Sequence, residues 1–239
     1  MDNRKIWSEK KTNVYYIDED FFRKWSPEMA YVLGFFAADG CLTINRKRGN
    51  KYIEFVSTDY EIIDKIRSTL KSKHMISARR RGVNHLISYR LQIGSKKIYH
   101  DLEDLGFMPN KSKILKFPHV PIVYLSHFIR GYFDGDGHCL FGKYQRKNRP
   151  SPTKIVFSGF SSGSNKFLQK LQVVLKRYAG ITGGSLCFSH NCFRLSFASA
   201  DSEKLYNFIY TDIGQSLYLS RKYIKFQQAL NKWGRSSVG

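Results

Sequence analysis

One apolar run occurs twice in this chain, and each copy ends in an aspartate followed by a glycine. The first copy, EMAYVLGFFAADG, places Asp39 before Gly40. The second copy, SHFIRGYFDGDG, places Asp136 before Gly137, 97 residues further on. That spacing leaves room for one compact folding unit between the copies. The repetition therefore predicts two similar halves whose acidic helix ends come together.

Small residues within each copy predict that two helices cross closely. Apolar side chains recur at helical spacing in both runs, so each run is predicted to form a buried helix. Gly34 and Ala38 lie four residues apart in the first copy, as do Gly131 and Gly135 in the second. Residues four apart share one helix face, and small side chains there let another backbone approach. The glycine after each aspartate is expected to end its helix in the left-handed conformation.

The two aspartates occupy unfavourable positions unless a cation accompanies them. A carboxylate at a helix C-terminus faces the negative end of the macrodipole, which costs roughly 0.3–1 kcal/mol. Two adjacent carboxylates also repel each other, and paired carboxylates are typical ligands of hard divalent cations. The alternative interpretation is that Asp39 and Asp136 belong to ordinary Asp-Gly turns. That alternative does not account for two copies in the same helical phase.

The net charge of the chain indicates a polyanionic partner. Lys and Arg number 40 against 19 Asp and Glu, which gives a formal net charge of +21. An excess of this size is typical of proteins that bind nucleic acid. Since 42% of the residues are hydrophobic and 15% are aromatic, the chain is expected to be folded rather than disordered.

Several other classes of protein are disfavoured by what the sequence lacks. No apolar run approaches the roughly 18 residues of a membrane span, and the N-terminus has no signal-peptide core. We therefore expect a cytoplasmic or organellar protein, located wherever the host DNA is, and not a secreted one. The four cysteines form no CxxC pair, so neither a zinc site nor a disulfide framework is indicated.

The two runs resemble the paired motifs of LAGLIDADG homing endonucleases, in the form that carries both copies on one chain. The nonapeptides are VLGFFAADG at 32–40 and IRGYFDGDG at 129–137, and the resemblance covers about 25–233. It implies an α+β fold of two pseudo-symmetric αββαββα halves, whose antiparallel sheets form a saddle in the DNA major groove. The first copy has Ala37 where the family name has its first D. That position is variable in the family and not catalytic.

The order of the predicted elements divides the chain into an N-terminal extension at 1–24, a first half at 25–121 and a second half at 122–239. Corresponding residues are 97 apart at the motifs and 104 apart at Arg90 and Arg194. The growing offset predicts an insertion in the first hairpin of the second half. A single chain with internal pseudo-two-fold symmetry is expected to act as a monomer.

Four predicted hairpins each offer one apolar face and one face of amide, hydroxyl and basic side chains. A two-stranded ribbon fits the major groove, where base edges present a readable pattern of donors and acceptors. For each residue alone, a solvated strand face is the alternative, but acids are nearly absent from these hairpins. Two differing halves predict an asymmetric target of roughly 20 base pairs. The predicted DNA-binding residues are Asn45, Arg46, Lys47, Arg48, Lys51, Arg79, Arg80, Arg81, Arg90, Gln92, Lys143, Gln145, Arg146, Lys154, His190, Asn191 and Arg194.

The resemblance further implies double-strand cleavage by divalent-metal-dependent phosphodiester hydrolysis. Asp39 and Asp136 are the predicted catalytic residues and metal ligands, and the backbone carbonyls of Ala38 and Gly135 are predicted to add ligands. The expected cofactor is Mg²⁺, for which Mn²⁺ or Ca²⁺ can substitute in the site. The expected partner is double-stranded DNA.

Two lysines are predicted to assist the metal site by similarity to the family, which places basic residues near the metal. Lys111 and Lys222 follow the last hairpin of each half at comparable places, and the alternative is that both are surface lysines. An RNA maturase or a non-cleaving DNA-binding protein on the same scaffold is the main competing function. Because such proteins can lose the acids, retention of both aspartates favours cleavage. We expect a free-standing, intron-encoded product.

Overall fold

The computed structural model describes residues 16–80, 82–83, 85–145, 150–211, 213–214 and 216–234. Within these residues the chain repeats the order helix, two strands, helix, two strands, helix, which confirms the predicted α+β class. The first half contains α1 (Pro27–Asp39), β1 (Gly40–Ile44), β2 (Lys51–Ser57), α2 (Tyr60–Thr69), β3 (Ile76–Arg79), β4 (Ser88–Ile93) and α3 (Lys96–Asp104). The second half contains α4 (Leu125–Asp136), β5 (Gly137–Tyr144), β6 (Thr153–Ser162), α5 (Asn165–Tyr178), β7 (Ser185–Ser189), β8 (Cys192–Ala198), α6 (Ser199–Ile209) and α7 (Ser220–Gly234).

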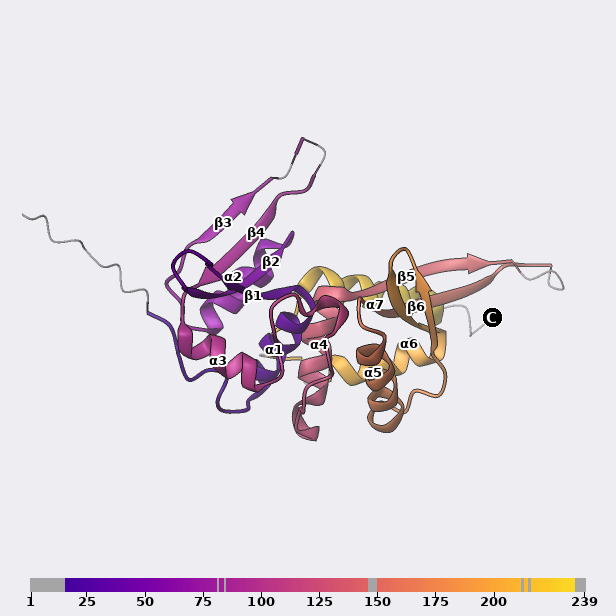
Figure 1. Ribbon diagram of the computed structural model, residues 1–239. Helices are drawn as coiled ribbons and strands as arrows, with labels where there is room; N and C mark the ends of the chain where they lie inside the picture. Colours follow the sequence, from indigo (N-terminus) through magenta and orange to yellow (C-terminus); the bar gives the residue numbers. More distant parts are fainter. Residues whose placement is uncertain are drawn as a thin grey trace, which may run out of the picture.

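The two halves meet along α1 and α4, which lie side by side in the middle of the molecule with one sheet on each side (Figure 1). Two short 3-10 turns, η1 (Lys111–Lys113) and η2 (Ile122–Tyr124), lie in the connector between the halves. None of the described helices combines the length and the apolar character that a membrane span requires.

Each half builds one antiparallel four-stranded sheet, in the orders β1-β2-β4-β3 and β5-β6-β8-β7. The register pairs Gly40 with Phe55 in the first sheet and Gly137 with Phe160 in the second. The partners are thus 15 residues apart in the first hairpin and 23 apart in its counterpart. The second half therefore carries its extra residues in its first hairpin, as predicted from the growing offset.

Alternation along the strands decides which face of each sheet is covered by helices. In the first sheet, Ile53 and Phe55 of β2 and Leu91 and Ile93 of β4 are fully buried. The residues between them point to the opposite face, which is the face predicted to meet DNA. This period of two is the pattern expected of a half-covered antiparallel sheet.

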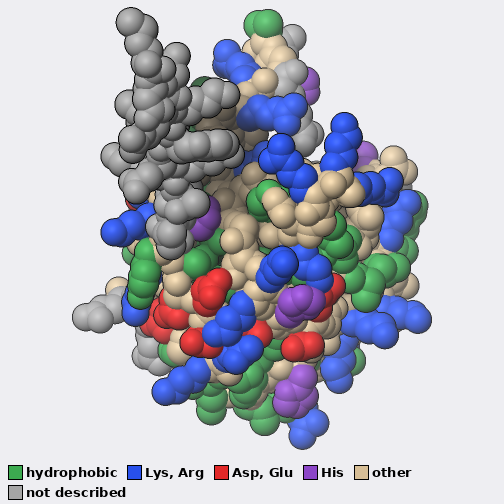
Figure 2. Space-filling view, turned by 60° about the vertical axis from the view of Figure 1, so that its left-hand side comes forward, with side chains coloured by type: hydrophobic (Ala, Val, Ile, Leu, Met, Phe, Trp, Pro, Cys, Tyr) green, Lys and Arg blue, Asp and Glu red, His purple; other side chains and the backbone are tan. Residues whose placement is uncertain are grey.

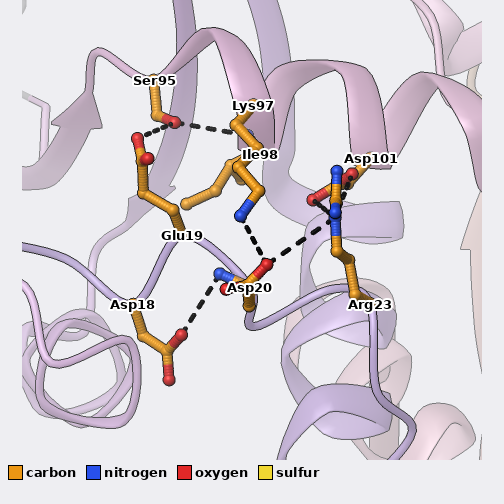
Figure 3. A network of polar contacts seen from close by, with 8 residues as sticks. All are labelled: Asp18, Glu19, Asp20, Arg23, Ser95, Lys97, Ile98 and Asp101. Carbon is orange, nitrogen blue, oxygen red and sulfur yellow. Dashed lines mark hydrogen bonds and ion pairs between the residues drawn. The ribbon is translucent and has the colours of Figure 1, made fainter.

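The described part of the predicted N-terminal extension packs onto the first half. Phe22 is 3% exposed and joins the core. Arg23 Nε donates to Asp101 of α3 at 3.2 Å, and Ser95, the N-cap residue of α3, donates to Glu19 at 2.8 Å (Figure 3). These contacts fix the chain where it enters α1, which begins at Pro27 directly after its N-cap residue Ser26.

Candidate active site

The crossing of α1 and α4 is close enough to bring backbone against backbone. A Cβ atom built on Gly34 would lie 2.0 Å from the carbonyl oxygen of Phe128, and one on Gly131 would lie 2.0 Å from that of Tyr31. A Cβ atom on Gly135 would lie 2.3 Å from the Cβ of Ala38. The small residues at these positions are thus what allows the two helix ends to meet.

The glycines that follow the two aspartates differ from the expectation. Gly40 has φ −92° and ψ 159°, and Gly137 has φ −85° and ψ 158°, so both are extended and neither is left-handed. Glycine is needed there for space instead, since a Cβ atom on Gly40 would lie 2.1 Å from the Phe36 ring, and one on Gly137 would lie 2.3 Å from the Phe133 ring. Each helix therefore continues directly into the first strand of its sheet.

The carboxyl groups of Asp39 and Asp136 lie near each other at these helix ends, and both are partly buried. Burial, reinforced by the neighbouring Asp136, raises the pKa of Asp39 to about 7. Burial also raises the pKa of Asp136, while Lys222 and Lys111 act in the opposite direction. The pair therefore carries negative charge that the described side chains compensate only in part.

Lys111 and Lys222 lie at equivalent places and cap the two helices. Lys222 Nζ donates to the carbonyl oxygens of Phe133, Gly135 and Gly137 at 2.8 Å each, and Lys111 Nζ donates to that of Gly40. Burial lowers the pKa of Lys222 to about 8 and also lowers that of Lys111. Two cations thus meet the negative helix ends beside the aspartates.

The donor set at the helix ends fits a hard divalent cation. Carboxylate and carbonyl oxygens are the ligands such ions prefer, and a cation between the two aspartates would relieve their repulsion. The carbonyl of Gly135 already accepts from Lys222 and keeps a second lone pair. No cluster of three or more His, Cys, Asp or Glu side chains suited to a metal occurs in the described part of the chain. The two aspartates would therefore need backbone, water or phosphate oxygens to complete the coordination.

Asp134 is a buried acid next to the site. The sequence motifs predicted no role for Asp134. It accepts from the Tyr31 hydroxyl at 2.6 Å and from the Leu219 backbone N–H at 2.8 Å. Burial raises the pKa of Asp134 to about 6. Nearby, Arg130 donates to the carbonyl oxygens of Leu217 and Ile209. These bonds join α1, α4 and the segment before α7, so Asp134 holds the site together. Its place as the first D of the second nonapeptide was the only signal for it in the sequence.

The raised pKa values predict that the stability of the metal-free protein falls as the pH rises. The folded state keeps protons on Asp39 and Asp134 up to a pKa of about 7 and about 6, whereas the unfolded chain releases them near about 3.9. Between these values the folded state binds more protons, so raising the pH favours unfolding. In chelator, we expect the melting temperature to fall on the order of 5 °C between about pH 5 and pH 8. Thermal denaturation should show a smaller fall for Asp39→Asn; a rise in the wild type would contradict the prediction.

The predicted DNA-binding residues at 45–48 lie in a turn. β1 ends at Ile44, and the side chain of Asn45 accepts from the backbone N–H of Lys47 at 3.1 Å. The strand ends before these residues because Asn45 bonds the local backbone. Asn45, Arg46, Lys47 and Arg48 are all exposed at the tip of the hairpin.

Lys51 lies on the opposite face from the other candidates. It shares its face of β2 with the buried Ile53 and Phe55. Its Nζ lies 3.4 Å from a Glu103 carboxylate oxygen and 4.5 Å from the centre of the Tyr99 ring, both on α3. Strand alternation thus turns Lys51 toward the helical layer and away from the remaining basic residues.

Arg90 and Gln92 lie on the predicted DNA face, but an acid holds them. Glu54 of β2 accepts from Arg90 at 2.8 Å, from Gln92 at 2.7 Å and from the Thr43 hydroxyl at 3.1 Å. Glu54 is an exception to the scarcity of acids in the hairpins and was not among the predicted DNA-binding residues. Its place on the polar face of β2 was visible in the alternation, but its partners on β4 were not.

The remaining candidates lie at strand ends and hairpin tips. Arg81 and Arg146 lie outside the described residues. His190 and Asn191 form the two-residue turn between β7 and β8 with φ 51° and 60°. Arg194 of β8 is half-buried and lies next to the buried Leu195, so strand alternation turns it to the uncovered face. The others are Arg79 and Arg80 at the end of β3, the cross-strand pair Lys143 and Lys154, and Gln145 after β5.

The face of the molecule drawn in Figure 2 carries acidic side chains in one part only. Figure 2 shows acidic side chains gathered in the lower part of one face with basic side chains between them. The upper part, toward which the β3–β4 hairpin projects in Figure 1, carries mainly Lys and Arg. A basic surface on the hairpin side is the arrangement expected of a protein that meets a polyanion there.

Comparison with known proteins shows what the sequence of the first half and the fold of the whole chain resemble. A family model described as a LAGLIDADG-like domain matches residues 26–105, most of the first half. The crystal structure of the LAGLIDADG meganuclease I-AabMI bound to uncleaved DNA has a TM-score of 0.62 at 13% identity, covering 90% of this chain and 92% of that chain. The fold of the whole chain is that of the single-chain LAGLIDADG homing endonucleases, and its first half carries the LAGLIDADG-like domain.

Further similar proteins include structures and one curated sequence. The homing endonuclease I-LtrWI bound to target DNA has a TM-score of 0.59 at 10% identity, covering 92% of each chain. I-SmaMI bound to an uncleaved DNA target in the presence of calcium ions has a TM-score of 0.57 at 11% identity, covering 90% of this chain and 94% of that chain. The uncharacterized protein MJ0398 of Methanocaldococcus jannaschii is 24% identical over 152 residues, 59% of this chain. The match spans 50% of that relative's length.

Proposed function

We propose that this protein is a site-specific DNA endonuclease that makes a double-strand break in a long asymmetric target by divalent-metal-dependent phosphodiester hydrolysis. The observation that carries the proposal is the pair of carboxyl groups with raised pKa values, Asp39 and Asp136, at helix ends pressed together by glycine contacts. The similar folds of I-AabMI and I-LtrWI, both solved with DNA, support duplex DNA as the partner.

In this proposal the aspartates hold Mg²⁺, and the carbonyls of Ala38 and Gly135 lie where they can add ligands. The calcium ions in the I-SmaMI complex support a divalent cation in this kind of protein. When bound, such an ion activates water and neutralises charge on the scissile phosphate. Lys111 and Lys222 place two further positive charges beside the reacting phosphates while they cap the helices.

The proposal extends to how the protein is used. Both motifs reside on one chain, so one molecule can act on both strands as a monomer. We infer an intron-encoded product that works in the compartment, cytoplasmic or organellar, that holds its DNA. The predicted hairpin residues, apart from the inward-turned Lys51 and from Arg90 and Gln92, which Glu54 holds, supply the DNA contacts.

Binding to duplex DNA is expected to weaken steeply as salt increases. Basic residues that neutralise phosphates release counterions, so the logarithm of the binding constant falls by about 0.9 per phosphate for each tenfold rise in salt. With six to ten contacts, affinity should fall roughly 10³–10⁵-fold between about 50 and 200 mM salt. Fluorescence anisotropy with a labelled duplex measures this slope, and a flat response would contradict the DNA face assigned here.

The nuclease itself is tested by selecting duplexes from a randomised library in Ca²⁺ and then incubating the selected pool with Mg²⁺. Sequencing the cut ends should give one defined break in each strand within an asymmetric site. Selective binding without any break would instead assign a non-cleaving DNA-binding protein, and preference for structured RNA over duplex DNA would assign a maturase.

A further inference from the structure

The surroundings of the two aspartates differ in charge, although the fold around them repeats. The backbone positions correspond, since Cys41 pairs with Glu54 and His138 pairs with Gly159 in the same place of each sheet. Arg90 and Arg194 likewise occupy equivalent places on β4 and β8. We call these places the first corner, made of Cys41, Glu54, Arg90 and Lys111, and the second corner, made of His138, Gly159, Arg194 and Lys222.

The first corner contains its own neutralising acid. Glu54 is ion-paired with Arg90 at 2.8 Å and lies close enough to Cys41 that, after burial, it contributes to raising the pKa of that thiol. The Glu54 side chain is 15% exposed and that of Arg90 is 34% exposed, so the pair is shielded in part from water. Lys111 donates to the backbone carbonyl of Gly40 and forms no ion pair within the described part of the chain, so it remains the unpaired cation of this corner.

The second corner has no acid at the equivalent place. A Cβ atom on Gly159 would lie 2.2 Å from the carbonyl oxygen of Leu195, so the backbone leaves no room for a side chain. Arg194 forms no ion pair with a carboxylate of the described residues, and its buried Nε, like that of Arg90, has no hydrogen-bond partner among them. The cation of Arg194 is thus left for a ligand from outside the protein.

An additional cation lies at the second corner. Lys225, three residues after Lys222 on α7, lines a hollow of about 170 Å³ together with His138 and Lys222. The second corner therefore presents Arg194 and Lys225, beside a Lys222 whose charge the buried Asp134 offsets in part. The first corner presents Lys111 and an Arg90 that Glu54 neutralises.

We propose that Glu54 makes the first corner the weaker phosphate site, so that the protein breaks the DNA strand at the second corner first. This inference rests on the proposed nuclease function. In each strand a water oxygen forms a bond to phosphorus, one ester P–O bond breaks, and the departing sugar oxygen takes up a proton. The charge that develops on the phosphate is better stabilised at the second corner, where no acid pairs with the arginine. Glu54 acts through Arg90 and is a positioning residue rather than a catalytic one.

The test follows both strands of the selected site, each carrying a different dye, on a supercoiled plasmid. The wild type should pass through a nicked circle, with one strand cut about tenfold faster than the other, as a barrier difference near 1.4 kcal/mol gives. Glu54→Gln keeps an acceptor for Gln92 and Thr43 but removes the charge. It should accelerate the slow strand several-fold and leave the fast strand unchanged. Arg194→Ala should slow the fast strand.

The matched control is Glu203→Gln, which removes the same charge from an exposed position on α6. It should leave the ratio of the two strand rates unchanged. DNA binding in chelator provides a second readout, since Arg90 freed by Glu54→Gln should steepen the salt slope by about 0.9.

Each outcome bears on a separate claim. Equal rates on the two strands in the wild type, or a Glu54→Gln variant that slows both strands together, would overturn the inference and leave the nuclease intact. An unchanged salt slope would overturn the role given to Glu54. A protein that binds its selected site and cuts neither strand would overturn the proposed function itself, and the strand order with it.

Discussion

Replacement of either Asp39 or Asp136 by Asn is expected to abolish double-strand cleavage while DNA binding stays within a few-fold of the wild type. The rate should fall by at least about 10³-fold, because losing a metal ligand forfeits several kcal/mol of charge stabilisation in the transition state. Binding should persist because the basic hairpins are untouched. The measurement pairs plasmid cleavage in Mg²⁺ with anisotropy in chelator on the same preparations.

The same variants separate a loss of metal from a loss of fold. Ca²⁺ should raise the melting temperature of the wild type, because an ion that binds only the folded state stabilises it. It should have little effect on Asp39→Asn, although that variant should be at least as stable as the wild type in chelator at about pH 8, since the carboxylate repulsion is gone. Glu203→Gln again controls for the change in net charge. Full cleavage by either aspartate variant would refute the assignment of that aspartate.

Gly34→Ala and Gly131→Ala are expected to have the largest effects on stability. The added methyl group would meet a backbone carbonyl oxygen at 2.0 Å in each case. A backbone atom cannot rotate away as a side chain can, so the two helices must separate, and overpacking of this kind costs about 3 kcal/mol or more. The melting temperature should drop on the order of 10 °C. Cleavage should fall as well, since the aspartates move apart.

Gly142→Ala is the matched control for these two variants. A Cβ atom on Gly142 meets nothing within 4 Å, and its backbone is not left-handed. Its melting temperature should stay within a few degrees of the wild type. If Gly34→Ala had the same melting temperature as Gly142→Ala, the helices could separate without cost. The close crossing would then not be what brings Asp39 and Asp136 together.

The features that a sequence can predict here are those set by local spacing. Helical spacing placed Gly34 and Gly131 on the face where the two helices cross. The structure confirms that face, since a Cβ atom built on either glycine would lie 2.0 Å from a carbonyl oxygen of the other helix. The offset between Arg90 and Arg194 placed the insertion in the correct hairpin, because equivalent strands must keep equal pairing. The functional roles given to Asp39 and Asp136 stay predictions until cleavage is measured.

The features that were missed depend on neighbours distant in the chain. Gly40 is extended because the Phe36 ring lies where its Cβ would be, and a cap rule based on local sequence does not contain that ring. Lys51 turns inward because the phase of β2 follows Ile53 and Phe55. Glu54 meets Arg90 only through a pairing between strands 36 residues apart. The composition gives the number of charged residues, but only the register between the strands shows which opposite charges pair.

The unequal lengths of the two leading hairpins have a consequence for the reach of the molecule along its substrate. β5 has 8 residues against 5 in β1, and β6 has 10 against 7 in β2. Three further residues extend a ribbon by about 10 Å. Successive nucleotides of one strand are about 3.4 Å apart along the duplex axis, so one arm extends some three steps further from the midpoint. Under the proposed function we therefore expect an off-centre footprint, with a break that does not divide the recognised sequence into equal parts.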